Sequence, residues 1–187
     1  MKTNISLLIE QMGLPGCEKF RVSKRLIAMS EKNPAALVPC FTQFRGLMNA
    51  ENQIIKWTAF KIIANLSTVA DGRQIAAVID EYLAPISGPV MITAANAIVG
   101  AAKIAAAQPV LAEKVVRGIL CVEHARYQTD ECRNIAIGRA ITALGTIGKE
   151  IAGQPSVVNF VERQTSNSRN ATRKKAVAFL RKLATRQ

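Results

Sequence analysis

The chain has 187 residues, of which 49% are hydrophobic and 5% aromatic, and its formal net charge is +12. This length suits a single domain with its own core, and a composition rich in Ala, Ile, Leu and Val but poor in aromatic residues favours packed helices over β-sheets. No run of about 18 residues is apolar throughout, and the N-terminal apolar patch is too short and polar for a secretory signal, which excludes a membrane span and predicts a cytoplasmic location.

The charge balance points to anionic partners. Lys and Arg number 25 against 13 for Asp and Glu. Such an excess attracts polyanions over a Debye length of about 8 Å at physiological salt, so nucleic acid and an anionic membrane surface are candidate partners. The alternative is that the basic residues only keep an apolar protein soluble.

Four cysteines, Cys17, Cys40, Cys121 and Cys132, occur without a CxxC pair or regular spacing. Neither a zinc site nor a disulfide framework is indicated, so reduced thiols are expected. No cofactor is predicted.

The first two predicted helical pairs span the N-terminal third of the chain. Residues 4–12 and 17–32 form the first pair across Gly13-Leu14-Pro15-Gly16, because two glycines and a proline interrupt a helix. Residues 34–48 and 52–69 form the second pair, with Pro34 in the first turn and Asp71-Gly72 at the end.

Three further pairs follow. They join residues 73–86 to 89–107, 109–123 to 130–148, and 155–164 to 168–185. The helix over residues 89–107 is rich in small residues on every side, so neighbours should pack against much of its circumference. The last pair is strongly basic, with no acid after its first basic residue; its cations are Arg163, Arg169, Arg173, Lys174, Lys175, Arg181, Lys182 and Arg186.

The second helices recur at intervals of 35 to 41 residues, counted from Cys17, Asn52, Pro89, Asp130 and Ser168. Regular helical hairpins with proline near each boundary are typical of stacked repeats. We therefore predict an all-α, right-handed α-α superhelix of five hairpins in one domain. The approximate units are residues 3–32, 33–72, 73–108, 109–153 and 154–187.

The pattern in residues 130–148 resembles HEAT repeats, which carry an Asp or Asn before the second helix, a basic residue near its start and an Ala-x-x-x-Leu-Gly pattern within it. Asp130, Arg133, Ala140, Leu144 and Gly145 match this pattern. Asn52, Lys56, Ile62, Leu66 and Ser67 match it more loosely. The resemblance implies a helical solenoid and leaves the activity open.

Helical periodicity assigns each second helix an inner and an outer face. The inward residues are Val22, Leu26, Met29, Ile55, Ala59, Ile62, Ile63, Leu66, Ile137, Ile141, Leu144, Thr172, Ala176, Phe179 and Leu183. The opposite ridge takes Gln53 and Ala64 and the candidate ligand-binding residues Lys24, Trp57, Lys61, Arg139, Lys174 and Arg181. Cations about 10 Å apart, the usual spacing of packed helices, suit a phosphate backbone or an acidic chain, and Trp57 beside Lys61 suits stacking.

Other polar residues are expected to support the stack. Arg133 should pair with Asp130 or with a carbonyl of the adjacent repeat, because a half-buried Arg needs a partner. Asn65, Asn96 and Asn134 should form hydrogen bonds between repeats.

An enzyme is a weaker interpretation. The pair Cys121-x-x-His124 offers a thiolate pair or half a metal site, but no second ligand pair accompanies it and residues three apart at a helix end meet by default. HEAT-like alkylpurine DNA glycosylases are basic single domains of similar build, yet the cluster of aromatic and acidic residues that they use is not apparent in this sequence.

The sequence therefore predicts a non-enzymatic binding scaffold whose basic concave face binds an acidic protein or peptide. The alternative is a nucleic-acid binding module. The oligomeric state stays open.

Overall fold

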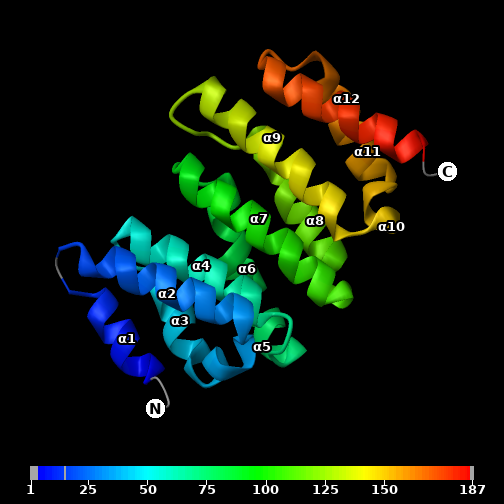
Figure 1. The fold of residues 1–187 in the computed structure, drawn as a ribbon. Helices are drawn as coiled ribbons and strands as arrows, with labels where there is room; N and C mark the ends of the chain where they lie inside the picture. Colours follow the sequence, from blue (N-terminus) through cyan, green and yellow to red (C-terminus); the bar gives the residue numbers. More distant parts are fainter. Residues whose placement is uncertain (1–3, 15, 186–187) are drawn as a thin grey trace. The chain divides into compact units, whose positions relative to one another are not determined.

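The computed structural model describes residues 4–14 and 16–185 (Figure 1). Pro15 and Arg186, both named above, lie outside these ranges. All regular structure in the described ranges is helical. The chain divides into two compact units, Met1–Val78 and Ile79–Gln187.

The first unit contains two helical pairs and a short final helix. Its α-helices are α1 (Ile5–Met12), α2 (Glu18–Lys32), α3 (Phe41–Leu47), α4 (Gln53–Leu66) and α5 (Gly72–Ala76). Asn52 begins α4, because its side-chain oxygen accepts hydrogen bonds from the amides of Ile54 and Ile55. The second helices α2 and α4 pack side by side (Figure 1).

The second unit contains three pairs. Its α-helices are α6 (Ile79–Leu83), α7 (Met91–Ala107), α8 (Ala112–Leu120), α9 (Asp130–Ile147), α10 (Lys149–Ala152), α11 (Pro155–Arg163) and α12 (Asn170–Ala184). Thr129 begins α9 by accepting the amide of Cys132, and Pro155 occupies the first turn of α11. The five predicted second helices correspond to α2, α4, α7, α9 and α12.

The first helices of the middle pairs are less regular than predicted. Residues 34–48 form a 3₁₀ helix, Pro34–Cys40, before α3, because Pro39 lacks the amide that a continuous α-helix needs. Residues 73–86 divide among α5, α6 and the 3₁₀ helix Ala84–Ser87, and residues 109–123 carry 3₁₀ turns on both sides of α8. The one-turn helix α10 was not predicted.

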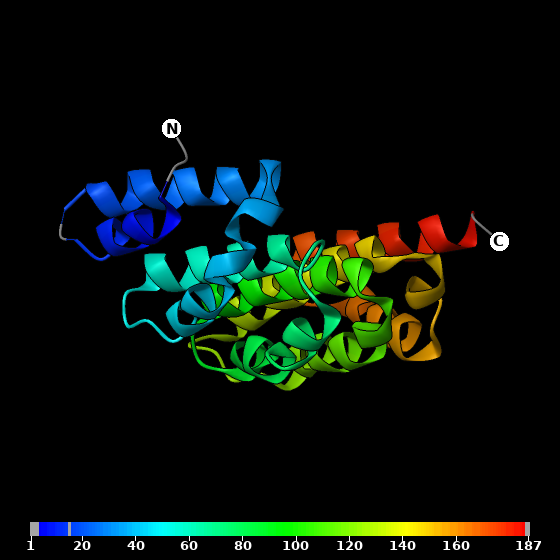
Figure 2. The same cartoon turned by 90° about the horizontal axis from the view of Figure 1, so that it is seen from below.

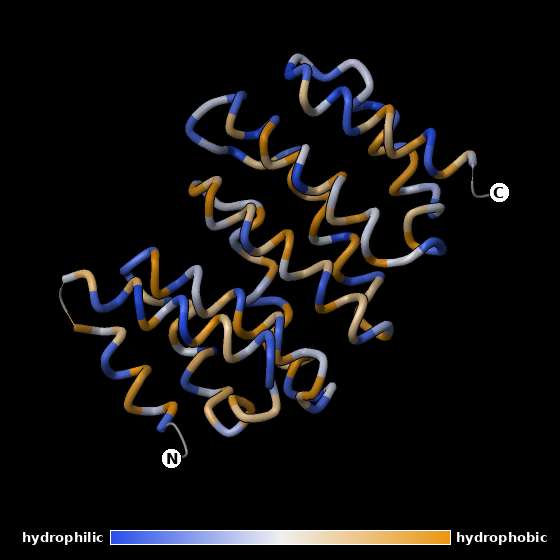
Figure 3. The backbone as a smooth tube through the Cα atoms, in the orientation of Figure 1, coloured by the Kyte–Doolittle hydropathy of each residue, from blue (hydrophilic) through white to orange (hydrophobic). Residues whose placement is uncertain are grey.

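The second unit has two helical layers. The helices α7, α9 and α12 lie side by side in one layer, and α6, α8 and α11 form the other (Figures 1 and 2). As predicted, α7 is buried around much of its circumference, and its small residues allow α9 to pack closely. Figure 3 shows hydrophobic and hydrophilic residues interspersed along α12, which packs against α9 and α11.

Most of the inward assignments are confirmed. The residues buried as predicted are Val22, Leu26, Ala59, Ile62, Ile63, Leu66, Ile137, Ile141, Leu144, Thr172 and Ala176. Met29, Ile55, Phe179 and Leu183 are only half-buried.

Two outward assignments on α4 are wrong. Ala64 is buried and Trp57 is half-buried, although both were expected on an exposed ridge. The reason is that the packed arc of α4 is wider than one face: from Thr58 to Leu66, every residue except Lys61 is buried.

Polar contacts between neighbouring second helices follow the prediction at two of three asparagines. The Asn65 amide donates to Ser30 Oγ on α2 at 2.7 Å, and the Asn134 amide donates to Ser168 Oγ at 2.9 Å. The Asn96 amide instead donates to the carbonyl of Ile92 in its own helix. These bonds satisfy amides that would otherwise be costly to desolvate.

The connector before α9 is held by Tyr127, whose hydroxyl donates to the carbonyl of Ile86. Burial raises the pKa of this tyrosine to about 12. Within the described ranges, no helix combines the length and hydrophobicity needed to cross a bilayer.

Candidate ligand-binding face

The helices α9 and α12 approach each other closely at Gly138. A Cβ atom built at this glycine would lie 2.9 Å from Thr172 Oγ1, which donates to the carbonyl of Asn134 at 2.8 Å. Lys175 Nζ donates to the carbonyl of Gly138 at 3.0 Å. The missing side chain thus lets two polar groups of α12 bond the backbone of α9.

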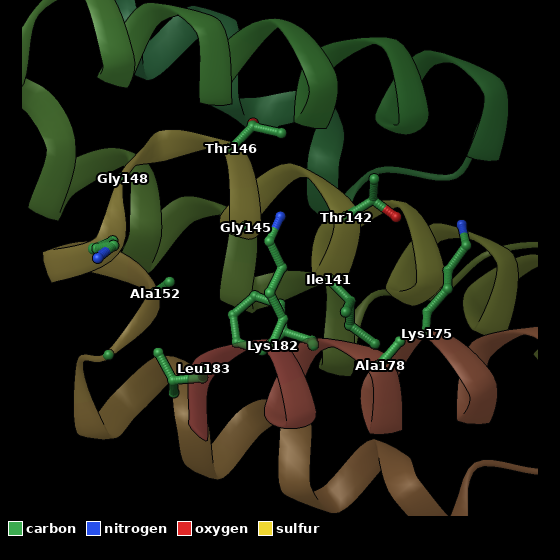
Figure 4. A pocket seen from close by; sticks show the side chains of 13 residues that line it. Ile141, Thr142, Gly145, Thr146, Gly148, Ala152, Lys175, Ala178, Lys182 and Leu183 are labelled. Carbon is green, nitrogen blue, oxygen red and sulfur yellow. The ribbon is translucent and has the colours of Figure 1, made fainter. Parts of the chain in front are cut away.

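A groove of about 700 Å³ follows the junction of α9 and α12 (Figure 4). It is lined by Ile141, Thr142, Gly145, Thr146 and Gly148 of α9 and its end, by Lys149, Ala152 and Gly153 around α10, and by Lys175, Ala178, Phe179, Lys182 and Leu183 of α12. Its volume lies within the range of about 300–1,000 Å³ that is usual for ligand sites.

The floor of the groove is apolar. Ile141 is buried beneath it, while Phe179 and Leu183 remain half-exposed because the residues around them are small. Gly145 is one of these: a Cβ atom there would lie only 3.3 Å from Phe179. The sequence prediction placed Phe179 and Leu183 in the core, and the glycines near the end of α9 were the signal that they would be left uncovered.

Three lysines stand around this floor. Lys175 and Lys182 extend from α12 toward α9 (Figure 4), and Lys149 begins α10. Burial, and then the nearby Arg139 and Arg169, lower the pKa of Lys175. Sequence reasoning did not select Lys149, Lys175 or Lys182 as site residues, because it ranked cations by helical face alone.

A second hollow, of about 690 Å³, adjoins the groove along α12, and Ala178 and Lys182 line both. Two of the predicted residues, Lys174 and Arg181, line it together with Arg173 and Lys182. The remaining predicted residue of this unit, Arg139, is exposed on α9 and close enough to Lys175 to affect its pKa.

The other predicted residues belong to the first unit. Lys24 on α2 and Lys61 on α4 are exposed, and Trp57 is half-buried on α4. A cation row running through both units therefore stays a prediction, as does the assignment of the six residues to a ligand site.

The exposed cations of α9, α10 and α12 that we call the basic face lack acidic partners in the described ranges, whereas other cations of the second unit are paired. Ion pairs join Lys114 to Asp80, Arg163 to Glu123, Arg133 to Asp130 and Arg169 to Glu131. Among the described residues, no carboxylate pairs with Arg139, Lys149, Lys174, Arg181 or Lys182. The positive charge of these five residues is therefore not neutralised by ion pairs within the described part of the chain.

The cluster that suggested catalysis has structural contacts instead. The Cys121 thiol donates to the carbonyl of Arg117, and Glu123 accepts hydrogen bonds from Arg163 and Gln164. Arg133 pairs with Asp130 at 2.7 Å, as predicted. The four cysteines are free, and no group of three metal-binding side chains forms within the described ranges.

Comparison with known proteins identifies the fold. No protein-family model and no curated protein matches the sequence. The chain is similar to a designed armadillo repeat protein, YIII(Dq.V1)4CPAF, solved in complex with the peptide (KR)4. The identity is 14% and the TM-score 0.63, over 96% of this chain and 81% of that chain.

This chain has an armadillo-like helical-repeat fold. A second designed armadillo repeat protein, YIII(Dq)4CqI, aligns over 96% of this chain and all of its own length with 13% identity, but at a TM-score of only 0.37. The predicted all-α solenoid is confirmed, and its assignment to HEAT repeats in particular stays a prediction.

Proposed function

We propose that this armadillo-like chain is a non-enzymatic binding module that holds an acidic protein or peptide on its basic face. The observation that carries the proposal is the group of described cations on α9, α10 and α12 without acidic partners, of which Lys149 and Lys182 line an open groove. Stacked helical pairs present such surfaces without needing a moving part.

The comparison with the designed protein supports a peptide as the ligand class, and the sign of the ligand's charge is inferred from this chain. That protein was solved with (KR)4, a peptide built only from basic residues. The present chain has a net charge of +12, and α12 alone carries five cations and no acid. A chain of this charge would repel a basic peptide and attract an acidic one.

Nucleic acid is the second candidate, because exposed cations such as Lys174 and Arg181 suit phosphates as well as carboxylates. A glycosylase is not proposed. Both tyrosines serve packing, since Tyr82 is buried and the Tyr127 hydroxyl is bonded to the backbone.

The test is binding of a fluorescein-labelled acidic peptide, such as a run of eight Glu and Asp residues, as a function of salt. We expect measurable affinity at 50 mM NaCl, a decline with rising salt, and a loss of at least about tenfold in the triple variant Arg139→Glu, Lys174→Glu, Lys182→Glu. The control variant, Arg73→Glu, Arg117→Glu, Arg126→Glu, changes the net charge equally with exposed residues outside this face.

Equal losses in the two triple variants would reduce the effect to net charge and contradict a localised face. Salt-sensitive binding of a duplex oligonucleotide with no peptide binding would favour the nucleic-acid alternative. The slope of log affinity against log salt then estimates how many phosphates are contacted.

A further inference from the structure

The groove between α9 and α12 combines an apolar floor with a charged rim, which is more than a cationic face requires. Phe179 and Leu183 of α12 lie half-exposed in it, and Ala178 beside them is exposed. Because exposed apolar surface in water is unfavourable, these side chains gain free energy from whatever covers them.

The floor of the groove is uncovered because several residues of α9 and α10 above it have small side chains or none. Gly145 and Gly148 carry no side chain over the groove, and Gly148, at φ 151°, turns the chain into the single turn of α10. Ala152 is the residue by which α10 reaches the groove beside Lys149. From Gly148 to Gly153, the lining residues are Gly148, Lys149, Ala152 and Gly153, and of these Lys149 has a long side chain.

We propose that this groove anchors an acidic segment of a partner protein through one bulky apolar side chain, which packs on Phe179 and Leu183 while flanking carboxylates pair with the lysines. The proposal rests on the proposed function and specifies its ligand. An aromatic anchor fits best, because its ring offers a large apolar area and its face attracts the surrounding ammonium groups.

The spacing of the lysines sets the spacing of the partner's acids. Lys175 and Lys182 are seven residues apart in α12, which corresponds to about 10 Å along the helix axis. Three residues of an extended peptide cover about the same length. Two acids three positions apart, with the anchor between them, would therefore place one carboxylate near each lysine.

The unpaired lysines of the groove favour an acidic segment over a neutral apolar one. Among the described residues, Lys149 and Lys182 have no ion-pair partner, so a neutral segment would cover the floor while leaving both ammonium groups partly desolvated. Carboxylates beside the anchor provide the missing partners.

The experiment compares two labelled peptides that differ at one residue. The sequences are Gly-Glu-Asp-Phe-Asp-Glu-Gly and the same peptide with Ala in place of Phe, both titrated at 50 mM NaCl by fluorescence anisotropy. We expect the Phe peptide to bind at least about tenfold more tightly, which corresponds to about 1.4 kcal/mol, because the ring is removed from water when it packs on the groove floor.

A variant that fills the groove tests whether the tighter binding of the Phe peptide depends on this site. Ala178→Phe places a ring in the groove from an exposed position of α12, so folding is preserved, and it should remove the advantage of the Phe peptide. Val177→Phe is the matched control: this neighbouring residue is exposed and lines the adjoining second hollow but not the groove. Circular dichroism checks that both variants keep their helices.

The possible results distinguish the apolar anchor from the proposed binding of an acidic ligand. Equal affinities for the two peptides would overturn the anchor and leave an acidic ligand in place, whereas no binding of either peptide would overturn both. An advantage that persists in Ala178→Phe would place the anchor elsewhere and overturn this site. Self-association that Ala178→Phe abolishes would show that a second copy covers the groove, which also overturns the proposal.

Discussion

Glu123 joins two neighbouring helical pairs. Its carboxylate accepts hydrogen bonds from Arg163 at 2.9 and 2.7 Å and from Gln164 at 2.9 Å, and its side chain is only 18% exposed. The hydrogen bonds from Arg163 lower the pKa of Glu123 and outweigh the opposing effect of burial.

Glu123→Gln should lower the free energy of unfolding at pH 7 by about 1–2 kcal/mol, because one charge-assisted contact is lost and the other is weakened. A depressed pKa in the folded state stabilises the protein above the unfolded pKa of about 4.3, and this contribution is lost as the pH falls through the folded value. The difference between wild type and variant should therefore shrink between pH 5 and pH 3. Urea unfolding at several pH values measures it.

Glu113→Gln is the control for this prediction. Glu113 forms a 3.7 Å ion pair with Arg117 one helical turn away, and both side chains are largely exposed. Such pairs contribute less than about 0.5 kcal/mol. A similar loss in both variants would mean that the half-buried position of Glu123 is unimportant.

At the scale of elements, the register between α9 and α12 depends on Gly138. Replacing a helical glycine by alanine usually stabilises a protein by up to about 1 kcal/mol. Here the added methyl group would meet the fully buried Thr172, whose hydroxyl is already engaged by Asn134. The steric conflict is expected to exceed the gain in helix propensity.

Gly138→Ala should therefore destabilise the protein by about 1 kcal/mol or more, while Gly46→Ala on α3 should be neutral or stabilising. No atom lies within 4 Å of a Cβ atom at Gly46, which makes it a matched control for helix propensity. Denaturant midpoints of the two variants test the prediction. A gain in stability for Gly138→Ala would show that α12 moves away at little cost.

Helix boundaries that depend on neighbouring residues could be predicted from the sequence. The starts of α4 and α9 follow from Asn52 and Thr129 acting as caps within four residues of the amides they bind. The irregular form of the first helices was not predictable, because a proline such as Pro39 shortens a helix without indicating whether a 3₁₀ turn replaces it.

For the whole molecule, the net charge of +12 should make stability rise with salt. Ion pairs such as Arg117–Glu113 and Lys114–Asp80 have well-exposed members, so they contribute little. Repulsion among the remaining cations destabilises the folded chain and is screened by added salt.

We expect the thermal midpoint to increase between 20 and 300 mM NaCl in the absence of a ligand. Calorimetry in NaCl and in KCl distinguishes screening from binding of a particular ion, since screening gives the same increase in both. A midpoint that falls with salt would mean that the ion pairs outweigh the repulsion.

The amino-acid sequence by itself determined the helical repeat, the positions of the second helices and most of their buried residues. These features depend on periodicity, caps and proline, which act within a few residues. Only the tertiary structure decided how completely each apolar arc is covered. Phe179 and Leu183 have the same helical spacing as core residues, yet they line a groove, because the opposing surface of Gly145, Gly148 and Ala152 is too small to cover them.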